Sequence, residues 1–196
     1  MSSIFTLASL ALLTLGYVAG YHGIIYIGED MFTATLYMLI LLAGMAIGME
    51  VQSIKESGRS ILIGSLMALS VILSGIASGL MLSRLFGIDA RIASAIGAAS
   101  GWYSLVGPMV SSIDPIYGVS SFIANILREI LHIILYPVLS RCCSTAAVSL
   151  GGATTMDTGL PVIALYGRRE DPVIALIQGG LITLTAPIIL TYILYL

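Results

Sequence analysis

The sequence predicts an all-α polytopic membrane protein with about five full transmembrane helices and two Gly-rich discontinuous or re-entrant segments. Of its 196 residues, 58% are hydrophobic and only 9% are charged, whereas a soluble domain carries roughly 25% charged residues. The apolar residues form runs of about 20, the length that crosses a bilayer as a helix. No linker or low-complexity stretch divides the chain, which indicates a single transmembrane domain over residues 1–196.

Composition also excludes several function classes. The net charge is −2 and there is no basic tract, so no nucleic-acid partner is expected. Cys142 and Cys143 are adjacent, which suits neither a metal framework nor a long-range disulfide. They are interpreted as small apolar residues at a helix end. Because the sequence has no nucleophile–base pair, no metal-ligand spacing and no phosphate loop, we expect no enzyme activity, no metal and no cofactor.

Five apolar runs are long enough to be full transmembrane helices. The first begins at Ile4 and lacks the positive leading region of a secretory signal, so we expect a helix that is retained in the mature protein. Polar and charged residues fill the junctions between the runs. The five predicted spans are 4–20 or slightly longer, 32–49, 60–82, 116–139 and 172–196.

Two further stretches, 92–112 and 143–166, are apolar but rich in Gly, Ser and Thr. GAASGWYS (97–104) and GGATTMDT (151–158) form a weak internal repeat, each followed by a proline. Interrupted segments in matching places are typical of a transporter binding site. The alternative is two ordinary helices that use small residues for close packing. The residues expected to break these helices are Gly97, Gly101, Pro108, Gly151, Gly152, Gly159 and Pro161.

Charge distribution favours re-entry of both stretches. With the N-terminus cytoplasmic and both stretches re-entrant, more basic residues fall inside than outside, as the positive-inside rule requires. Two full crossings would reduce this bias, and both versions place the C-terminus outside. In the re-entrant version the inside residues are Lys55, Arg59, Arg141, Arg168 and Arg169, and the outside ones are Arg84 and Arg91.

The fourth span carries a polar stripe, in ANILREILHII. Asn125, Arg128, Glu129 and His132 are spaced i, i+3, i+4 and i+7 and so share one helix face. A charge at the bilayer centre costs about 2.5–3.5 kcal/mol on insertion scales, so this face should point to the protein interior or to a water path. One alternative is an Arg128–Glu129 pair that only steadies the bundle. For His132, a simple hydrogen-bonded interior role is also open.

Glu129 and Asp157 are the two carboxylates placed most clearly inside the membrane. Burial raises the pKa of a carboxyl group and a bound ammonium lowers it, so protons and a cationic substrate would compete for the same oxygens. Such competition is the physical basis of proton–cation antiport. Trp102 and Tyr103 would wall the site by cation–π contact, or anchor the helices at the interface instead. Further candidate binding residues are Asn125, Arg128, His132, Thr154, Thr155 and Ser104.

SGWYSL (100–105), NILREIL (125–131) and GGATTMDTGLPV (151–162) resemble the LysO-type lysine exporter family, over roughly residues 90–196. The resemblance implies a cell-membrane protein that exports L-lysine and its analogue thialysine, with protons as the driving ion. It also implies that Glu129 and Asp157 carry transport. Longer members of the family have extra N-terminal spans, so a short version is expected to need a second copy of itself.

Two other function classes stay open: a monovalent cation–proton antiporter and a non-transporting subunit of a membrane assembly. GxxxG motifs at Gly44/Gly48 and Gly75/Gly79 let helix backbones approach closely. They predict a homodimer, with packing inside one chain as the alternative. The partners expected from the sequence are thus L-lysine, protons, the lipid bilayer and a second copy of the chain.

Overall fold

The computed structural model describes residues 58–195 and, among the first 45, residues 14–16, 18–23, 31, 34, 37, 38, 41 and 45. The chain divides into two compact units, Met1–Leu39 and Ile40–Leu196. In the first unit, residues 14–16 and 18–21 are helical. The predicted spans 4–20 and 32–49 lie largely outside the described residues, and the Gly44/Gly48 motif lies wholly outside them.

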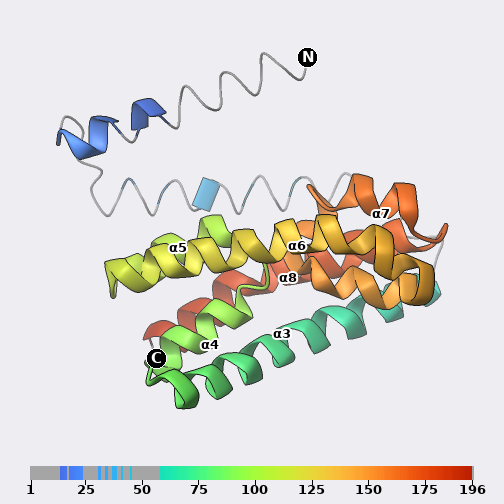
Figure 1. The fold of residues 1–196 in the computed structure, drawn as a ribbon, viewed down its shortest axis with the longest axis horizontal. Helices are drawn as coiled ribbons and strands as arrows, with labels where there is room; N and C mark the ends of the chain where they lie inside the picture. Colours follow the sequence, from blue (N-terminus) through green and yellow to red (C-terminus); the bar gives the residue numbers. More distant parts are fainter. Residues whose placement is uncertain are drawn as a thin grey trace. The chain divides into compact units, whose positions relative to one another are not determined.

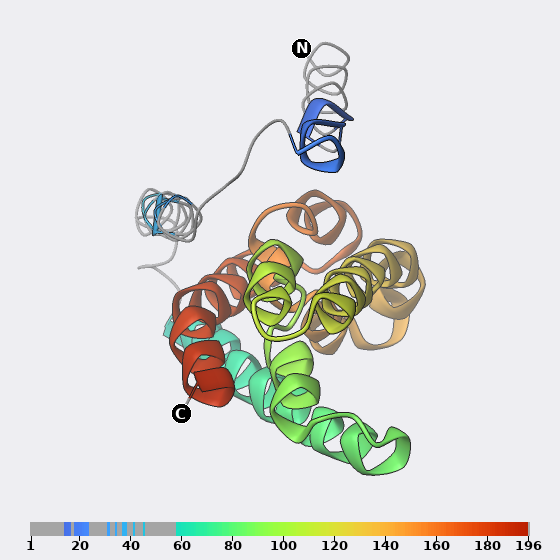
Figure 2. The same ribbon diagram turned by 90° about the vertical axis from the view of Figure 1, so that its left-hand side faces the viewer.

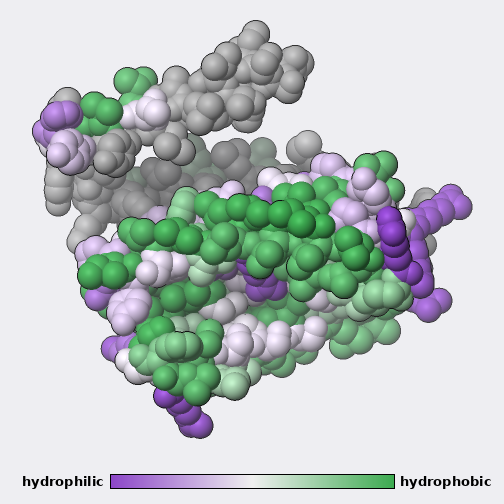
Figure 3. Space-filling model, viewed as in Figure 1, coloured by the Kyte–Doolittle hydropathy of each residue, from purple (hydrophilic) through white to green (hydrophobic). Residues whose placement is uncertain are grey.

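The second unit is all-helical over residues 58–195, and three of its helices are long and apolar enough to cross a membrane. They are α3 (Gly58–Phe86), α6 (Pro115–Ala147) and α8 (Asp171–Tyr195), and they run roughly along one direction (Figures 1 and 2). They cover the predicted spans 60–82, 116–139 and 172–196. Hydrophobic side chains cover much of the outer face, while strongly hydrophilic ones gather toward its ends (Figure 3), as expected for helices that face lipid.

α3 packs closely along α8. A Cβ placed on Gly64 would lie 2.8 Å from the Ile177 side chain, so the absence of a side chain allows this approach. Further along both helices, Val71 and Ile72 join one buried apolar cluster with Ile182. The contacts advance in the same direction along both chains, so α3 and α8 are parallel.

The segment 92–112 is broken into two short helices, α4 (Ala90–Ala98) and α5 (Tyr103–Ser111). Asp89 caps α4 by accepting hydrogen bonds from the N–H groups of Arg91 (2.8 Å) and Ile92 (3.4 Å). The bond from Arg91 lowers the pKa of the Asp89 carboxyl, although partial burial opposes this.

The break itself lies at Ser100 and Gly101, whose φ angles are +51° and +99°. This left-handed backbone is natural for glycine and costs a serine about 1–2 kcal/mol. Gly97 and Pro108, which were expected to break the segment, instead lie inside α4 and α5. Gly97 is small for a different reason, because its Cβ would lie 2.0 Å from the carbonyl oxygen of Gly75 on α3.

The first broken segment doubles back on itself. Gly75 and Gly79 of α3 contact the backbone of α4 at Gly97 and Ala93, respectively, so α4 runs antiparallel to α3. The Gly75/Gly79 motif therefore serves packing within the chain, as the alternative interpretation held.

The second helix of the broken segment, α5, runs antiparallel to α6. A Cβ on Gly107 would lie 3.0 Å from Phe122, and one on Gly118 would lie 2.6 Å from Ser111 Cα. At the end of α5, the Ser112 hydroxyl is 2.7 Å from the hydroxyl of Tyr195, near the end of α8. We call α4, α5 and the turn between them the first hairpin.

The second broken segment begins where α6 bends at Cys143, whose backbone is non-helical (φ −146°, ψ 59°). The short helices η1 (Val148–Leu150), η2 (Gly152–Met156) and α7 (Leu160–Tyr166) follow. Gly152 has φ +62°, Gly159 precedes α7, and Pro161 lies in its first turn. We call residues 144–166 the second hairpin.

Its two ends meet at Asp171, the first residue of α8. The Asp171 carboxylate accepts hydrogen bonds from the Ser144 hydroxyl, the Thr145 hydroxyl (2.6 Å) and the backbone N–H of Arg168 (2.7 Å). Both hairpins thus start and end beside the ends of long helices, and their tips lie between those ends.

Candidate functional site

The two hairpin tips touch through their backbones. The N–H of Ala153 donates a 2.8 Å hydrogen bond to the carbonyl of Ser100. A Cβ on Gly152 would lie 2.0 Å from the same carbonyl oxygen, and one on Gly101 would lie 2.9 Å from the carbonyl oxygen of Gly151. The two parts of the weak repeat are therefore neighbours in space, and glycine is required where they meet.

Asn125 of α6 fastens the first tip. Its Oδ1 accepts a 2.7 Å hydrogen bond from the N–H of Gly101, directly at the break. Its Nδ2 donates to the carbonyls of Ile96 (3.2 Å) and Ser121 (3.0 Å). The buried amide thus satisfies backbone groups that the interrupted helix leaves unpaired.

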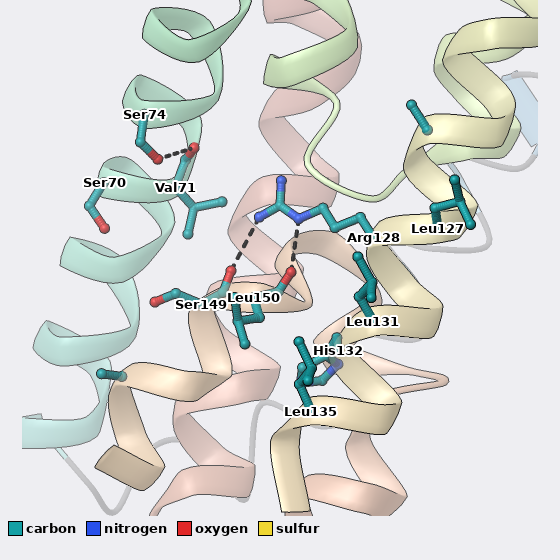
Figure 4. Close-up of a pocket in the computed structure, with 12 residues that line it drawn as sticks. Ser70, Val71, Ser74, Leu127, Arg128, Leu131, His132, Leu135, Ser149 and Leu150 are labelled. Carbon is teal, nitrogen blue, oxygen red and sulfur yellow. Dashed lines mark hydrogen bonds between the residues drawn. The ribbon is translucent and has the colours of Figure 1, made fainter. Parts of the chain in front are cut away.

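Arg128, one helical turn further along α6, fastens the second tip. Its Nε donates to the carbonyl of Leu150 (2.8 Å) and its Nη2 to the carbonyl of Ser149 (3.2 Å), as Figure 4 shows. Within residues 58–195 the structure shows no ion pair between Arg128 and Glu129. The guanidinium thus anchors a backbone turn, and the expected alternative of an Arg128–Glu129 pair does not form.

Glu129 lies on the turn of α6 that fastens both hairpins. Its side chain is buried, with 9% of its surface exposed, and no hydrogen bond or ion pair reaches its carboxylate from the described part of the chain. Tyr103, the first residue of α5, lies close enough to both Glu129 and Asp157 to interact with their charges. The structure therefore brings these three candidate residues into one region.

Asp157 ends η2 and is more exposed than Glu129. Its Oδ1 accepts hydrogen bonds from the neighbouring residue only, through the N–H (2.6 Å) and the hydroxyl (3.3 Å) of Thr158. No basic side chain pairs with it among the described residues. Both predicted carboxylates are thus available to a cation.

Several other candidates turn away from this region. The Thr154 hydroxyl donates to the carbonyl of Gly151 (3.0 Å), and the Thr155 hydroxyl lies within hydrogen-bond distance of the carbonyls of Gly152 (2.8 Å) and Ala175 (3.0 Å). These hydroxyls stabilise the second tip. Trp102 packs against the apolar cluster between α3 and α8, and Ser104 is half-buried.

His132 is fully buried, and neither of its ring nitrogens has a hydrogen-bond partner. Gly151 and Gly159 of the second hairpin lie against its ring, where a Cβ would come within 2.8 Å. The simple hydrogen-bonded interior role does not describe this histidine. It lines a cavity of about 620 Å³ between α3, α6 and the second hairpin, together with Arg128.

Asp171 and Gln178 are among the buried polar residues that sequence reasoning missed. Asp171 is fully buried, although its place at a predicted helix end suggested exposure. Gln178 of α8 is also fully buried and donates to the carbonyls of Val148 (3.3 Å) and Gly152 (3.4 Å). The only sequence signal for Gln178 is a polar side chain in the middle of the predicted span 172–196.

Comparison with known proteins shows which family this chain belongs to. Residues 10–194 match the model of the family described as lysine exporter LysO. The chain belongs to the LysO family. Lysine exporter LysO of Escherichia coli K12 is 29% identical over 184 residues, which cover 91% of this chain and 60% of that protein.

A second LysO relative, the "Putative lysine exporter" of Haemophilus influenzae Rd, is 27% identical over 166 residues, 81% of this chain and 83% of that protein. The matched part of this chain covers only about 60% of the length of the Escherichia coli relative. No solved structure matches the chain. Membership of the LysO family makes this a membrane protein of an amino-acid exporter family, and the transmembrane helices agree with that class.

Proposed function

We propose that this chain exports L-lysine, and its analogue thialysine, across the cell membrane in exchange for protons. The observation that carries the proposal is the Glu129 carboxylate, which is buried and has no countercharge within residues 58–195. A lone buried carboxylate is costly as an anion unless a cation or a proton neutralises it. The choice of lysine as the substrate rests on the names of the LysO relatives.

Exchange follows from competition for the carboxylates. An ammonium group of lysine and protons compete for the carboxylates of Glu129 and Asp157, and either can neutralise them. When lysine leaves, the acids take up protons again, because the uncompensated charges are unfavourable at this depth. Tyr103 lies close enough to both acids to interact with their charges.

Both hairpins are proposed to re-enter the membrane from opposite sides. α3 with the first hairpin and α6 with the second hairpin form two similar units, and α6 runs antiparallel to α3, as in the inverted repeats of transporters. The tips then meet at membrane depth, where broken backbone is tolerated only inside protein or beside water. This topology places the N-terminus in the cytoplasm and the C-terminus outside.

The homodimer expected from the sequence remains part of this proposal, with one change. The Gly75/Gly79 face of α3 is covered by α4, so another surface must form the contact. Light scattering of the purified protein in detergent measures the oligomer. A monomer that still transports lysine would reject the dimer.

The test of function is lysine counterflow in liposomes that contain the purified protein, with and without a pH gradient. Glu129→Gln and Asp157→Asn keep shape while removing the charge, and each is expected to abolish lysine transport without loss of folded protein. Glu170→Gln, in the loop before α8, makes the same chemical change outside the site and should transport normally.

Three outcomes would change this proposal. Proton-coupled flux of Na⁺ or K⁺ in lysine-free liposomes, without lysine transport, would make the protein a monovalent cation–proton antiporter. Normal lysine export with unchanged pH dependence in Asp157→Asn would show that this carboxylate is structural. If neither lysine nor cations move, the remaining class is a non-transporting assembly subunit.

A further inference from the structure

We propose that the cavity beside Arg128 binds the head group of the transported amino acid, its α-carboxylate and α-ammonium. This inference rests on the proposed function and adds a second binding position to it. Glu129 and Arg128 are consecutive residues, so their side chains project about 100° apart around α6. The cavity therefore lies on the face of α6 next to the one that carries Glu129.

Arg128 supplies the carboxylate contact. A guanidinium has five N–H donors, and Arg128 uses two of them on the carbonyls of Ser149 and Leu150. Those bonds fix the plane of the group, and its remaining nitrogen points away from both carbonyls in Figure 4. A carboxylate can accept from such a fork with a charge-assisted hydrogen bond.

Two hydroxyl groups of the cavity are free to act as acceptors, which suits an ammonium. Ser70 and Ser74 of α3 donate their hydroxyl protons to the carbonyls of Met67 (2.9 Å) and Val71 (3.1 Å) in their own helix, which leaves their oxygen lone pairs free. His132 borders the same cavity, but its ring is fully buried and both of its nitrogens are enclosed by protein, so it is not counted among these acceptors.

The rest of the lining is apolar and suits a hydrocarbon chain. It includes three leucine side chains of α6, which follow one another along the helix in Figure 4 and are partly exposed, together with Val71, Leu150 and two alanines. The volume of about 620 Å³ falls within the range of small-molecule sites, roughly 300–1,000 Å³. The cavity thus combines one cation, two hydroxyl acceptors and an apolar wall, the features that an α-amino acid with a long side chain requires. The lining leucines of α6 are Leu127, Leu131 and Leu135.

The experiment compares three ligands by calorimetry on the purified full chain in detergent. L-lysine carries the carboxylate, L-lysinamide replaces it by an amide, and cadaverine lacks the head-group carboxylate altogether. We expect lysinamide and cadaverine to bind about tenfold or more weakly than lysine, because a hydrogen bond to a charged group is lost. Equal binding of all three would overturn the inference.

A matched pair of variants locates the site. Ser74→Leu fills the cavity and breaks no hydrogen bond between helices, whereas Ser78→Leu makes the same change one turn along α3, outside the cavity lining. We expect Ser74→Leu to weaken lysine binding about tenfold or more and Ser78→Leu to leave it unchanged. Lysine binding and export that persist in Ser74→Leu would overturn the cavity assignment alone.

Failure of the proposed function can be distinguished from failure of the cavity assignment. If the unmodified chain exports no lysine in liposomes, that function is wrong. The cavity assignment still stands if lysine binds better than lysinamide and Ser74→Leu abolishes the difference. If lysine does not bind the unmodified chain in detergent, the cavity assignment is wrong as well, and Arg128 only anchors the second hairpin.

Discussion

The N–H of Ala153 donates a 2.8 Å hydrogen bond to the carbonyl of Ser100, and this bond joins the tips of two hairpins that lie far apart in the sequence. Both partners are main-chain groups at helix breaks. In lipid such groups must be satisfied by protein or water, and here each tip satisfies a group of the other.

A side chain at Gly152 should separate the tips. Gly152→Ala would place a methyl group 2.0 Å from the Ser100 carbonyl and on a backbone with φ +62°. We expect a destabilisation of about 2–4 kcal/mol, from steric overlap and left-handed strain together. The measure is the thermal unfolding midpoint in detergent. Gly58→Ala is the control, because nothing lies within 4 Å of its Cβ position, and it should leave the midpoint unchanged or raise it.

Asn125 should be needed as both donor and acceptor. Asn125→Leu leaves the Gly101 N–H and the Ile96 carbonyl unpaired, with an expected cost of about 1–3 kcal/mol for each buried group. Asn125→Asp keeps an acceptor for Gly101 but loses both donor contacts. We expect stability to fall in the order Asn, Asp, Leu. Equal stability of the leucine variant and the unmodified chain would show that Asn125 does not hold the first tip.

The topology can be read by labelling single cysteines. Residue 113 follows α5 and residue 141 precedes the bend of α6, so Ile113→Cys and Arg141→Cys report opposite ends of α6. In a background with Cys142→Ser and Cys143→Ser, a membrane-impermeant maleimide applied to intact cells should label position 113 and not position 141. The reverse pattern would place the first hairpin on the cytoplasmic side and contradict the proposed orientation.

Asp171 should be structural rather than part of transport. Its carboxylate accepts from Ser144, Thr145 and the N–H of Arg168, so it closes the open end of the second hairpin. Asp171→Ala leaves three donors without their acceptor, and we expect a loss of about 2–4 kcal/mol in stability. Ser144→Ala removes one of these three donors, together with the longer contacts of its hydroxyl to the Arg168 N–H (3.3 Å) and the Tyr136 hydroxyl (3.4 Å), and should cost less, about 1–2 kcal/mol. If Asp171→Ala folds with native stability yet fails to transport lysine, the residue belongs to the transport site.

The long helices could be predicted from the sequence because hydropathy and length alone decide whether a segment suits a bilayer. α3 and α8 match the predicted spans 60–82 and 172–196 closely. The stripe on α6 also follows from spacing, since Asn125, Glu129 and His132 are all buried.

The partners of these residues could not be predicted, because they depend on tertiary contacts. Spacing places Arg128 beside Glu129 and invites an ion pair, yet the guanidinium binds the carbonyls of Ser149 and Leu150 instead. The unpaired carbonyls of a broken helix compete for it, and their existence depends on where the break falls. Asp171 lies at a helix start beside a proline. Nothing in the neighbouring sequence indicates that the hydroxyls of Ser144 and Thr145 will donate hydrogen bonds to its carboxylate.

The contact between the tips has a consequence for how this fold can change its substrate. Ser100, Gly152 and Ala153 meet through main-chain atoms, which every amino acid carries alike. Substitution there alters the strength of the junction and offers almost no choice of chemistry. Side chains that can vary without touching the junction line the cavity, most of them on α3 and α6 and two on η1. If the proposed function holds, divergence toward other substrates is therefore open to these side chains and closed to the main-chain junction itself.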